Sequence, residues 1–474
     1  MQRGIASGVS WKLFERFGVQ GVSFILQVVL ARLLSPSDYG MLSLMAIFVS
    51  LTNILIQNGF NSALMQKKDT DELDFSSVFW VCMISSSIMY IILFALAPVI
   101  SHFFGMPGLV WPFRVLTLML LPGAWNSVQL AVVGRNLDFK KVFTSNVLAV
   151  VISGLIGICA AFLGAGVWAL VVQTLLNSVI ACIVMALTVD WFPKMEFDFS
   201  RVSKLFSFGW KLLFANLLDE LYQDSSSLIV GKLYNAGQLG IYNRGRQFPQ
   251  LINNSVTGAV QSVMLPAMAK LQDNHKQMLK NIRQSIQMIA FLTFPIMSGL
   301  AAIASNLVLV LLTAKWINCV PYLRLFCVAM ACYPIYTCNF QAFNAVGRSD
   351  VYLKVEIQKK VFGVLTLIAA VLFSRSILIL TWTIVLTNLL GIFLNIRPNF
   401  IMFGYRFSEQ ARDIVPSAFI SVIMGILVYY IGGLISSPVL GLVIQLATGL
   451  ISYVVLARLL KMKQLSYLIN MSRK

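Results

Sequence analysis

Long apolar runs, separated by short polar segments, are the dominant pattern of this sequence. An apolar run of about 18 or more residues is long enough to cross a lipid bilayer as an α-helix. Helices are expected because hydrocarbon offers the backbone no hydrogen-bond partner, so each segment must satisfy its own polar groups. The period-two alternation of β-strands is absent. The pattern therefore predicts an all-α integral membrane protein with about fourteen transmembrane helices.

The predicted spans follow one another along the whole chain with short connections. Their ranges are 10–33, 40–63, 77–101, 113–134, 144–164, 167–189, 210–234, 238–268, 285–312, 319–345, 355–374, 376–397, 414–434 and 439–459. The first span is of full length, carries Glu15 and Arg16 and lacks a cleavage pattern, so we expect it to stay in the protein. No connection reaches the roughly 50 residues that an independent domain needs. Any function is expected to reside in the helices.

Two short matches indicate an internal repeat. Trp-Lys-Leu opens the first span at 11–13 and the seventh at 210–212, and Val-Gly-Arg ends the fourth span at 133–135 and the tenth at 346–348. Both pairs lie six spans apart. Because six is even, two six-helix lobes would cross the membrane in the same direction, which is the parallel-repeat plan of many transporters.

The repeat predicts the organisation of the chain. We expect an N-terminal six-helix lobe at residues 1–200 and a C-terminal six-helix lobe at 201–400. Residues 401–474 are expected to form two additional transmembrane helices and a cytoplasmic tail. Residues 190–209 carry apolar side chains at helical spacing with basic residues opposite, which predicts an interfacial helix joining the lobes.

The charge distribution orients the predicted helices. The chain is 58% hydrophobic and 11% charged, with a net charge of +18. A basic chain can indicate nucleic-acid binding, but most of the 36 Lys and Arg residues lie in the segments expected on the inner side. This is the positive-inside asymmetry of membrane proteins. It predicts that both termini are cytoplasmic and that no nucleic acid is bound.

Residue types that commonly form metal or catalytic sites are scattered. The seven cysteines show no C-x-x-C pair, and His102 and His275 lie in separate loops. No glycine-rich phosphate loop, serine elbow or metal-ligand spacing is present. We therefore expect no metal, no cofactor and no catalytic residue, and read the cysteines as small buried hydrophobic side chains.

The seventh predicted span carries polar and acidic residues, which are Asn216, Asp219, Glu220, Gln223 and Asp224. Asn216, Glu220 and Gln223 follow the spacing i, i+4, i+7 and share one helix face. Ionisable groups inside a membrane are costly unless hydrated or paired, so they mark functional sites. We expect the three carboxylates to couple an ion or line a cavity, with Asn216 and Gln223 binding substrate there. The alternative is that the acids pair with neighbours and hold the bundle together.

The first predicted span carries a matching polar stripe of Lys12, Arg16, Gln20, Ser23 and Gln27. If the lobes face one another through the first and seventh spans, the two stripes enclose a hydrated cavity, and Arg16, Gln20 and Gln27 become candidate substrate-binding residues. In the alternative interpretation Lys12 and Arg16 extend their charged ends to the membrane surface.

Two further arginines are candidate binding residues. Arg244 and Arg246 lie one to two turns inside the eighth predicted span, and a guanidinium group can bind a phosphate through two hydrogen bonds. The alternative is that they are interface anchors.

Three segments carry a resemblance to a known family. They are SGVSWKLFERFGVQGVSFILQVVLARLLSPSDYG at 7–40, LPAMAKLQDN at 265–274 and TAKWINCVPYLRLFCVA at 313–329. They resemble the polysaccharide-export (Wzx-type) flippases of the multidrug/oligosaccharidyl-lipid/polysaccharide superfamily, and especially the branch that includes the colanic acid exporter. The resemblance extends over residues 7–400 and implies two lobes as in multidrug transporters of that superfamily.

The resemblance implies a function. A protein of this family would flip undecaprenyl-diphosphate-linked oligosaccharide repeat units across the bacterial inner membrane by alternating access, for exopolysaccharide or O-antigen synthesis. Implied partners are this substrate, membrane lipids, a polysaccharide polymerase and a chain-length regulator, and we expect a monomer. Family members typically have a basic central cavity, whereas the seventh span here is acidic, which favours ion coupling or pairing with Arg16.

Two other functions stay open. One is a cation-coupled exporter of small molecules, such as drugs, with the same fold. The other is an enzyme, a polysaccharide polymerase or ligase of the inner membrane. Such enzymes work through a large outer loop, and the outer connections of this sequence are short. We therefore expect a transporter and not an enzyme.

Overall fold

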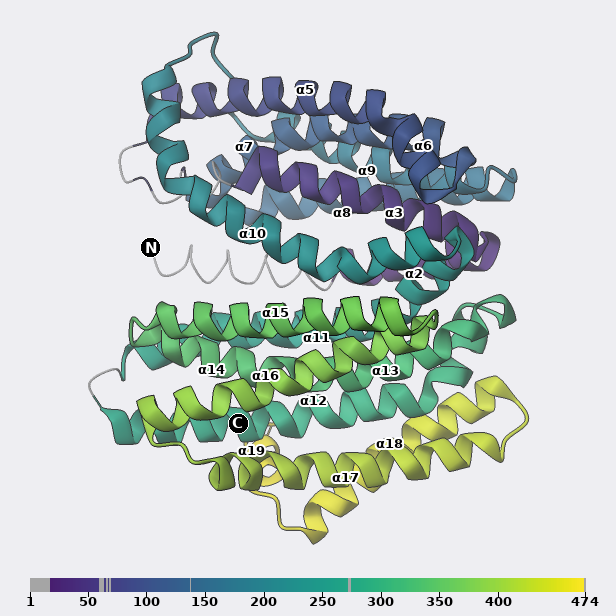
Figure 1. Ribbon diagram of the computed structural model, residues 1–474, viewed down its shortest axis with the longest axis vertical. Helices are drawn as coiled ribbons and strands as arrows, with labels where there is room; N and C mark the ends of the chain where they lie inside the picture. Colours follow the sequence, from purple (N-terminus) through teal and green to yellow (C-terminus); the bar gives the residue numbers. More distant parts are fainter. Residues whose placement is uncertain are drawn as a thin grey trace. The chain divides into compact units, whose positions relative to one another are not determined.

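The computed structural model describes residues 18–58, 64, 67, 70–136, 138–271 and 274–472. These residues form helices joined by short connections and include no β-strand, which confirms the predicted all-α class. The chain divides into two compact units, unit 1 at Met1–Gly240 and unit 2 at Ile241–Lys474. Figure 1 shows the helices of each unit.

Unit 1 is a bundle of long helices with a few short segments. The described helices are α2 (Gln20–Leu33), α3 (Pro36–Asn53), the π-helical segment η2 (Ile54–Asn58), α5 (Glu72–Phe104), η3 (Pro107–Leu109), α6 (Val110–Leu116), η4 (Thr117–Met119), α7 (Leu120–Asn136), α8 (Phe139–Phe162), α9 (Val167–Thr188) and α10 (Phe199–Leu233). Within the unit, α8 packs along α9, α2 along α8, and α5 against α7.

Unit 2 contains most of α11 (Ala236–Ala269), which begins in unit 1, and the rest of the chain. Its other helices are α12 (His275–Leu311), η5 (Ala314–Cys319), α13 (Val320–Ala331), α14 (Tyr333–Ala345), α15 (Ser349–Phe373), α16 (Ile377–Phe403), α17 (Phe407–Gly433), α18 (Pro438–Leu459) and α19 (Lys463–Ser472). Here α12 packs along α17, α15 along α16, and α17 along α18 (Figure 1).

Ten helical segments in the described part of the chain are long and apolar enough to cross a membrane. Three further long helices, α10, α11 and α15, have 35, 34 and 25 residues but contain more polar side chains. The described part of α2 adds a shorter, largely apolar helix of 14 residues. Every predicted span coincides with one of these segments at least in part, so the multi-pass architecture is confirmed, while the total of fourteen crossings stays a prediction.

Helix starts are set by local sequence. Ser35 caps α3 in a reciprocal hydrogen-bond pair with Asp38, and Pro36 occupies the first helical position, where a missing N–H costs nothing. Asp71 and Asp74 make the same reciprocal arrangement at the start of α5. Both helices therefore begin where a side chain satisfies the first free backbone N–H groups.

The linker before α10 is held against the start of α5. The backbone N–H groups of Lys194 and Asp198 donate to Ser76 Oγ and Ser77 Oγ, each at 3.0 Å. Trp80 Nε1 donates to the carbonyl oxygen of Lys194 at 2.9 Å. The linker thus has a defined conformation in unit 1.

Arg201, in the first turn of α10, adds an ionic contact to the same helix. Its Nη1 lies 2.6 Å from both carboxylate oxygens of Asp71. The predicted interfacial helix is not a separate element, because Asp198 caps α10 at its start and the helix then runs without interruption into the predicted seventh span.

The start of α11 crosses the start of α3 at two glycines. A Cβ atom on Gly40 would lie 1.7 Å from the carbonyl oxygen of Ala236, and one on Gly240 would lie 1.9 Å from that of Pro36. Position 236 is the first residue of α11, as 36 is of α3, so the contact is reciprocal. This equivalence supports the internal repeat indicated by the sequence.

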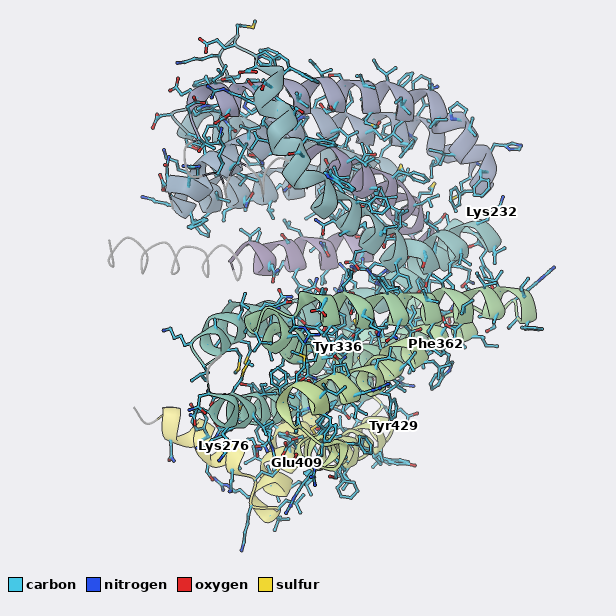
Figure 2. The ribbon with its side chains drawn as sticks, turned by 60° about the vertical axis from the view of Figure 1, so that its left-hand side comes forward. Lys232, Lys276, Tyr336, Phe362, Glu409 and Tyr429 are labelled. Atoms are coloured by element: carbon cyan, nitrogen blue, oxygen red, sulfur yellow. The ribbon has the colours of Figure 1, made fainter. Side chains whose placement is uncertain are left out.

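Unit 2 contains a charged cluster that joins α12 to α17. Arg283 binds Asp413 through Nε at 2.8 Å and Nη2 at 3.2 Å, and binds Glu409 through Nη1 at 2.7 Å. Tyr405 and Gln287 also donate to the buried Asp413 carboxylate, at 2.8 and 2.6 Å. Figure 2 labels Glu409 among these helices. The first of the two predicted additional helices, α17, is thereby joined to α12, and α18 packs against both.

The division into units places α10 with unit 1, because α10 packs against α3, η2 and α5. The lobe boundaries predicted at residues 200 and 400 stay predictions. The C-terminal segment, expected as a tail, contains α19, and Gln464 of this helix donates to Gln287 of α12 at 3.1 Å.

Candidate functional site

The polar segment of α10 is the most accessible part of that helix. Its ends are packed: Arg201 binds Asp71 at one end, and Gly231 lies against Leu44 and Phe104 at the other. Between them, no residue from 213 to 225 is buried. The exposed side chains include the apolar Phe214, Leu218 and Leu221, which suit lipid. Because polar side chains in a membrane protein avoid lipid, the face that carries Asn216 and Gln223 is expected to meet a hydrated space.

The five predicted residues of α10 occupy this segment. Asp219, Glu220 and Asp224 are half-buried, while Asn216 and Gln223 are exposed. Gln223 Nε2 donates to Asp219 Oδ2 at 2.8 Å, which joins neighbours one helical turn apart. The described part of the chain provides no hydrogen bond or ion pair for Glu220. Half-buried carboxylates of this kind can bind a cation or a proton.

The residues predicted on the first span are described only in part. Arg16 lies outside the described residues, as does Lys12. Gln20, the first residue of α2, is exposed, and Gln27 is half-buried on the same helix. The described part of α2 packs mainly against α8. Whether this stripe and the acidic segment of α10 share one cavity stays a prediction.

Arg244 and Arg246 lie near the start of α11 in unit 2. Arg244 is 5% exposed, and its guanidinium carbon lies 4.9 Å from the ring centroid of the buried Trp316. Its Nη1 donates to Gln247 Oε1 at 2.5 Å. Arg246 is half-buried. A guanidinium stacked on an indole ring is rigid, and such a group suits the recognition of a planar or phosphate-bearing ligand.

A buried ion pair in unit 2 was not predicted as a site. Lys359 Nζ lies 2.9 Å from Glu356 Oε1 on α15. From the sequence, Lys359 counts as one of the basic residues expected near the inner membrane surface, but the structure places it ten residues inside α15 with 5% of its surface exposed. The sequence feature that could have indicated this pair is Glu356, which lies three positions before Lys359 and can pair with it on one helix face.

Further half-buried and buried polar groups lie on η2, on the end of α3 and on α7 in unit 1. Gln57 Nε2 donates to Asn53 Oδ1 at 3.1 Å, and both side chains face Gly123 of α7. Gln129, also on α7, is fully buried, and neither of its amide atoms has a hydrogen-bond partner in the described part of the chain. A π-helical segment beside such groups is frequent at functional sites.

Metal coordination was tested on the described residues. Within them, no three His, Cys, Asp or Glu side chains are grouped so as to hold a metal ion. The seven cysteines are all described and are free thiols.

Long apolar helices in two units, with carboxylates and arginines inside them, define an integral membrane transport protein. The chain belongs to the polysaccharide biosynthesis protein family, whose sequence profile matches residues 29–321, more than half of its length. This match confirms the resemblance to polysaccharide-export flippases of the multidrug/oligosaccharidyl-lipid/polysaccharide superfamily.

Three curated relatives support the assignment. The succinoglycan biosynthesis transport protein ExoT of Rhizobium meliloti is 23% identical over 68% of this chain and 65% of its own length. The lipopolysaccharide biosynthesis protein WzxC of Escherichia coli is 23% identical over 68% of this chain and 66% of its own length. The teichuronic acid biosynthesis protein TuaB of Bacillus subtilis is 22% identical over 90% of this chain and 88% of its own. The matches thus span just under two thirds of the first two relatives.

Two solved structures show the same fold. The lipid II flippase MurJ in an inward closed conformation superimposes with a TM-score of 0.73 at 14% identity, covering 96% of this chain and 98% of that one. An inward-facing multidrug transporter of the MATE family gives a TM-score of 0.59 at 16% identity, covering 87% and 97%. The family match agrees with the expectation of a transporter-family protein.

Proposed function

We propose that the chain is a flippase that moves undecaprenyl-diphosphate-linked oligosaccharide repeat units across the bacterial inner membrane for the synthesis of a surface polysaccharide. The fold likeness to a lipid II flippase over nearly the whole chain is the observation that carries the proposal. Lipid II, exopolysaccharide and O-antigen precursors share a polar sugar headgroup on a polyprenyl diphosphate. The names of the curated relatives point to the same pathways.

The proposed mechanism is alternating access of two lobes around a hydrated cavity. The exposed polar segment of α10 supports such a cavity, since no residue from 213 to 225 is buried. We propose that Asn216 and Gln223 of this segment bind the substrate headgroup, together with Arg16, Gln20 and Gln27 of the first span. Arg244 and Arg246 would bind the diphosphate, for which guanidinium groups have suitable donor geometry.

The carboxylates Asp219, Glu220 and Asp224 would couple transport to an ion. A half-buried carboxylate can bind a cation or proton in one conformation and release it in another, which gives the two conformations different stabilities. Both termini would lie in the cytoplasm, as the distribution of basic residues indicates. The protein would act as a monomer and deliver its substrate to a polysaccharide polymerase with its chain-length regulator.

The experiment that tests the function is deletion of the gene in its native bacterium. We expect the surface polysaccharide to disappear and undecaprenyl-linked intermediates to accumulate, and a plasmid copy to restore both to normal. Normal polysaccharide in the deletion strain would contradict the proposal. A defect in flipping should accumulate the lipid-linked precursor, whereas a defect in sugar synthesis should not, so the direct measurement of the precursor distinguishes them.

A second candidate function is cation-coupled export of small molecules. The fold likeness to MATE transporters favours it. Two measurements distinguish a small-molecule exporter from a flippase. They are the drug-resistance profile of the deletion strain and dye efflux from vesicles that contain the purified protein. A flippase should leave resistance unchanged and produce no efflux.

A further inference from the structure

The Glu356–Lys359 pair lies on the inward face of α15. Lys359 is the eleventh residue of the helix, about 15 Å along its axis at 1.5 Å per residue. Val355, Lys359 and Gly363 form one buried row at intervals of four. The side chains of Lys359 and Glu356 are 7% and 14% exposed. Taking two charges out of water is costly, so a pair at this depth needs further stabilising contacts.

Aromatic rings of α14 provide such contacts for the ammonium group. Lys359 Nζ lies 4.8 Å from the ring centroid of Tyr336 and 5.6 Å from that of Tyr333. Both distances are within the range of cation–π attraction. Tyr336 lies inside unit 2, as Figure 2 shows. The ammonium group therefore keeps favourable partners when the carboxylate beside it is neutralised.

The neighbouring helix α16 leaves room for the lysine. A Cβ atom on Gly391 would lie 3.2 Å from Lys359 Cδ, so the glycine admits the alkyl chain. Tyr336 donates its hydroxyl hydrogen to Asn388 Oδ1 of the same helix at 3.3 Å. In the described part of the chain, the contacts of the Lys359 ammonium group are thus the rings of Tyr333 and Tyr336 from α14 and the carboxylate of Glu356. Asn388 of α16 binds the hydroxyl group of Tyr336.

One face of α16 continues from this point with three asparagines. Asn388, Gly391, Asn395 and Asn399 recur at intervals of three to four residues on that face, and Asn395 and Asn399 are buried while Asn388 is half-buried. Asn395 donates to the carbonyl oxygen of Gly391 at 2.7 Å. Asn399 is fully buried, and neither of its amide atoms has a hydrogen-bond partner in the described part of the chain.

Two more side-chain carbonyl oxygens, one on α16 and one on the neighbouring helix α14, also lack a partner in the described part of the chain. Asn395 Oδ1 and Asn339 Oδ1, the latter from α14, are buried and have no hydrogen-bond partner among the residues that the structure describes. Buried amides are almost always hydrogen-bonded, to protein or to ordered water. Unpartnered amides near an ion pair are therefore suited to hold ordered water.

We propose that the Glu356–Lys359 pair is a proton-binding site of the transport cycle and that the amides of α16 hydrate its access path. This inference rests on the proposed transport function and names the proton as a coupling ion. A proton adds to a carboxylate oxygen of Glu356, which becomes a neutral acid, and Lys359 remains an ammonium ion on the tyrosine rings. The net charge of the pair changes from zero to +1, and release of the proton reverses it.

The test is pH-difference infrared spectroscopy of the full-length protein in phospholipid vesicles. On acidification, a buried glutamic acid gives a carboxylic C=O band. We expect this band in the wild type and its loss in Glu356→Gln. Glu356→Asp, which keeps a carboxyl group, should shift the band without removing it and serves if the glutamine variant is not recovered.

Asp350→Asn is the matched control. Asp350 lies on the same helix and also pairs with a cation, Arg348 at 2.9 Å, but its side chain is 65% exposed. The control should keep the buried-acid band and normal export. In cells, Glu356→Gln should be present in the membrane at wild-type level and export no polysaccharide.

Two results would overturn the inference. One is a band that is the same in the wild type and Glu356→Gln, which would mean that the pair is a permanent structural ion pair. The other is normal export by Glu356→Gln. If the deletion strain itself makes normal polysaccharide, the proposed function fails, whereas the infrared result still reports whether Glu356 binds a proton.

Discussion

At the scale of single residues, the structure gives the accessibility of the acidic groups of α10. Asp219, Glu220 and Asp224 are half-buried. Glu220 has no ion pair in the part of the chain that the structure describes. Whether these carboxylates act in transport or hold the bundle together stays a prediction, which substitution tests.

Asp224→Asn is expected to abolish export without loss of the protein. The substitution keeps the size of the side chain but removes its charge, so a coupling ion has no anionic partner. Surface polysaccharide measured in the complemented deletion strain, together with the amount of protein in the membrane, checks the prediction. Glu196→Gln, an exposed position in the linker, is the control. Wild-type export by Asp224→Asn would return this residue to a structural role.

Whether a residue could be predicted as a functional candidate depended on its neighbours in the sequence. The acids of α10 stand out in the sequence because they interrupt an apolar run. Lys359 does not stand out, since Lys354, Lys359 and Lys360 read together as a basic segment at a membrane surface. Its burial depends on Gly391 and Tyr336, which come from other helices and can be placed only by the tertiary structure.

At the scale of helices, two ionic clusters fix elements that lie far apart in the sequence. The Arg283 cluster joins α12 to α17, and the Arg201 contact joins α10 to α5. The long apolar runs predicted where the helices lie, and every predicted span coincides with a helical segment at least in part. The ionic clusters could not be predicted in this way, because their partners are more than 100 positions apart, as with Arg283 and Asp413 at a separation of 130.

Arg283→Met is expected to destabilise unit 2. Asp413 is 3% exposed at its side chain, so removing the arginine leaves a buried carboxylate without its main counter-charge. Loss of one partner of a buried pair costs about 3–5 kcal/mol. A lower thermal-unfolding midpoint of the purified protein measures the effect. The double variant Arg283→Met/Asp413→Leu should recover much of the loss, and a double variant as unstable as the single one would contradict this explanation.

Arg201→Gln is expected to loosen the linker before α10. Trypsin cleavage after the exposed Lys194 should become faster, because the Asp71 contact no longer holds the start of α10. The hydrogen bonds from Arg201 and from the backbone of Asp74 lower the pKa of Asp71 below its usual 3.8. A lowered folded-state pKa means that this stabilisation is complete above about 3.8 and is lost only as the pH falls through the lower folded value.

The wild-type cleavage rate, corrected for the activity of trypsin, should therefore be constant at neutral and mildly alkaline pH. Asp71→Asn should match Arg201→Gln, and Glu196→Gln should match the wild type. Unchanged cleavage in Arg201→Gln would show that the backbone hydrogen bonds to Ser76 and Ser77 are sufficient to hold the linker.

Gly40→Ala is expected to disrupt the crossing of α3 and α11. The new methyl group would lie 1.7 Å from a backbone carbonyl oxygen, which a rotamer change cannot relieve. Overpacking costs about 1–3 kcal/mol or more. The amount of monodisperse protein after detergent extraction should fall, as it should for Gly240→Ala. Gly21→Ala is the control, because a Cβ there meets nothing within 4 Å. A well-folded Gly40→Ala variant would show that the helices can separate.

At the scale of the whole molecule, composition and hydrophobic pattern were sufficient for the fold class, and the quoted segments for the family. The family profile at residues 29–321 and the fold likeness to a lipid II flippase confirm both. The predicted division into lobes stays a prediction. A repeat marks equivalent positions in the sequence, whereas the compact units follow from packing, and α10 packs with α3 and α5 in unit 1.

The glycine crossing also bears on the origin of the molecule. In a symmetric homodimer, residue i of one subunit contacts residue j of the other, and residue j of the first contacts residue i of the second. Pro36 with Gly240 and Ala236 with Gly40 follow this rule at a constant offset of 200 positions. A half-length ancestor could have made the same contact between two copies before gene duplication and fusion. Homologous sequences should then keep or replace both glycines together, and independent replacement would refute this origin.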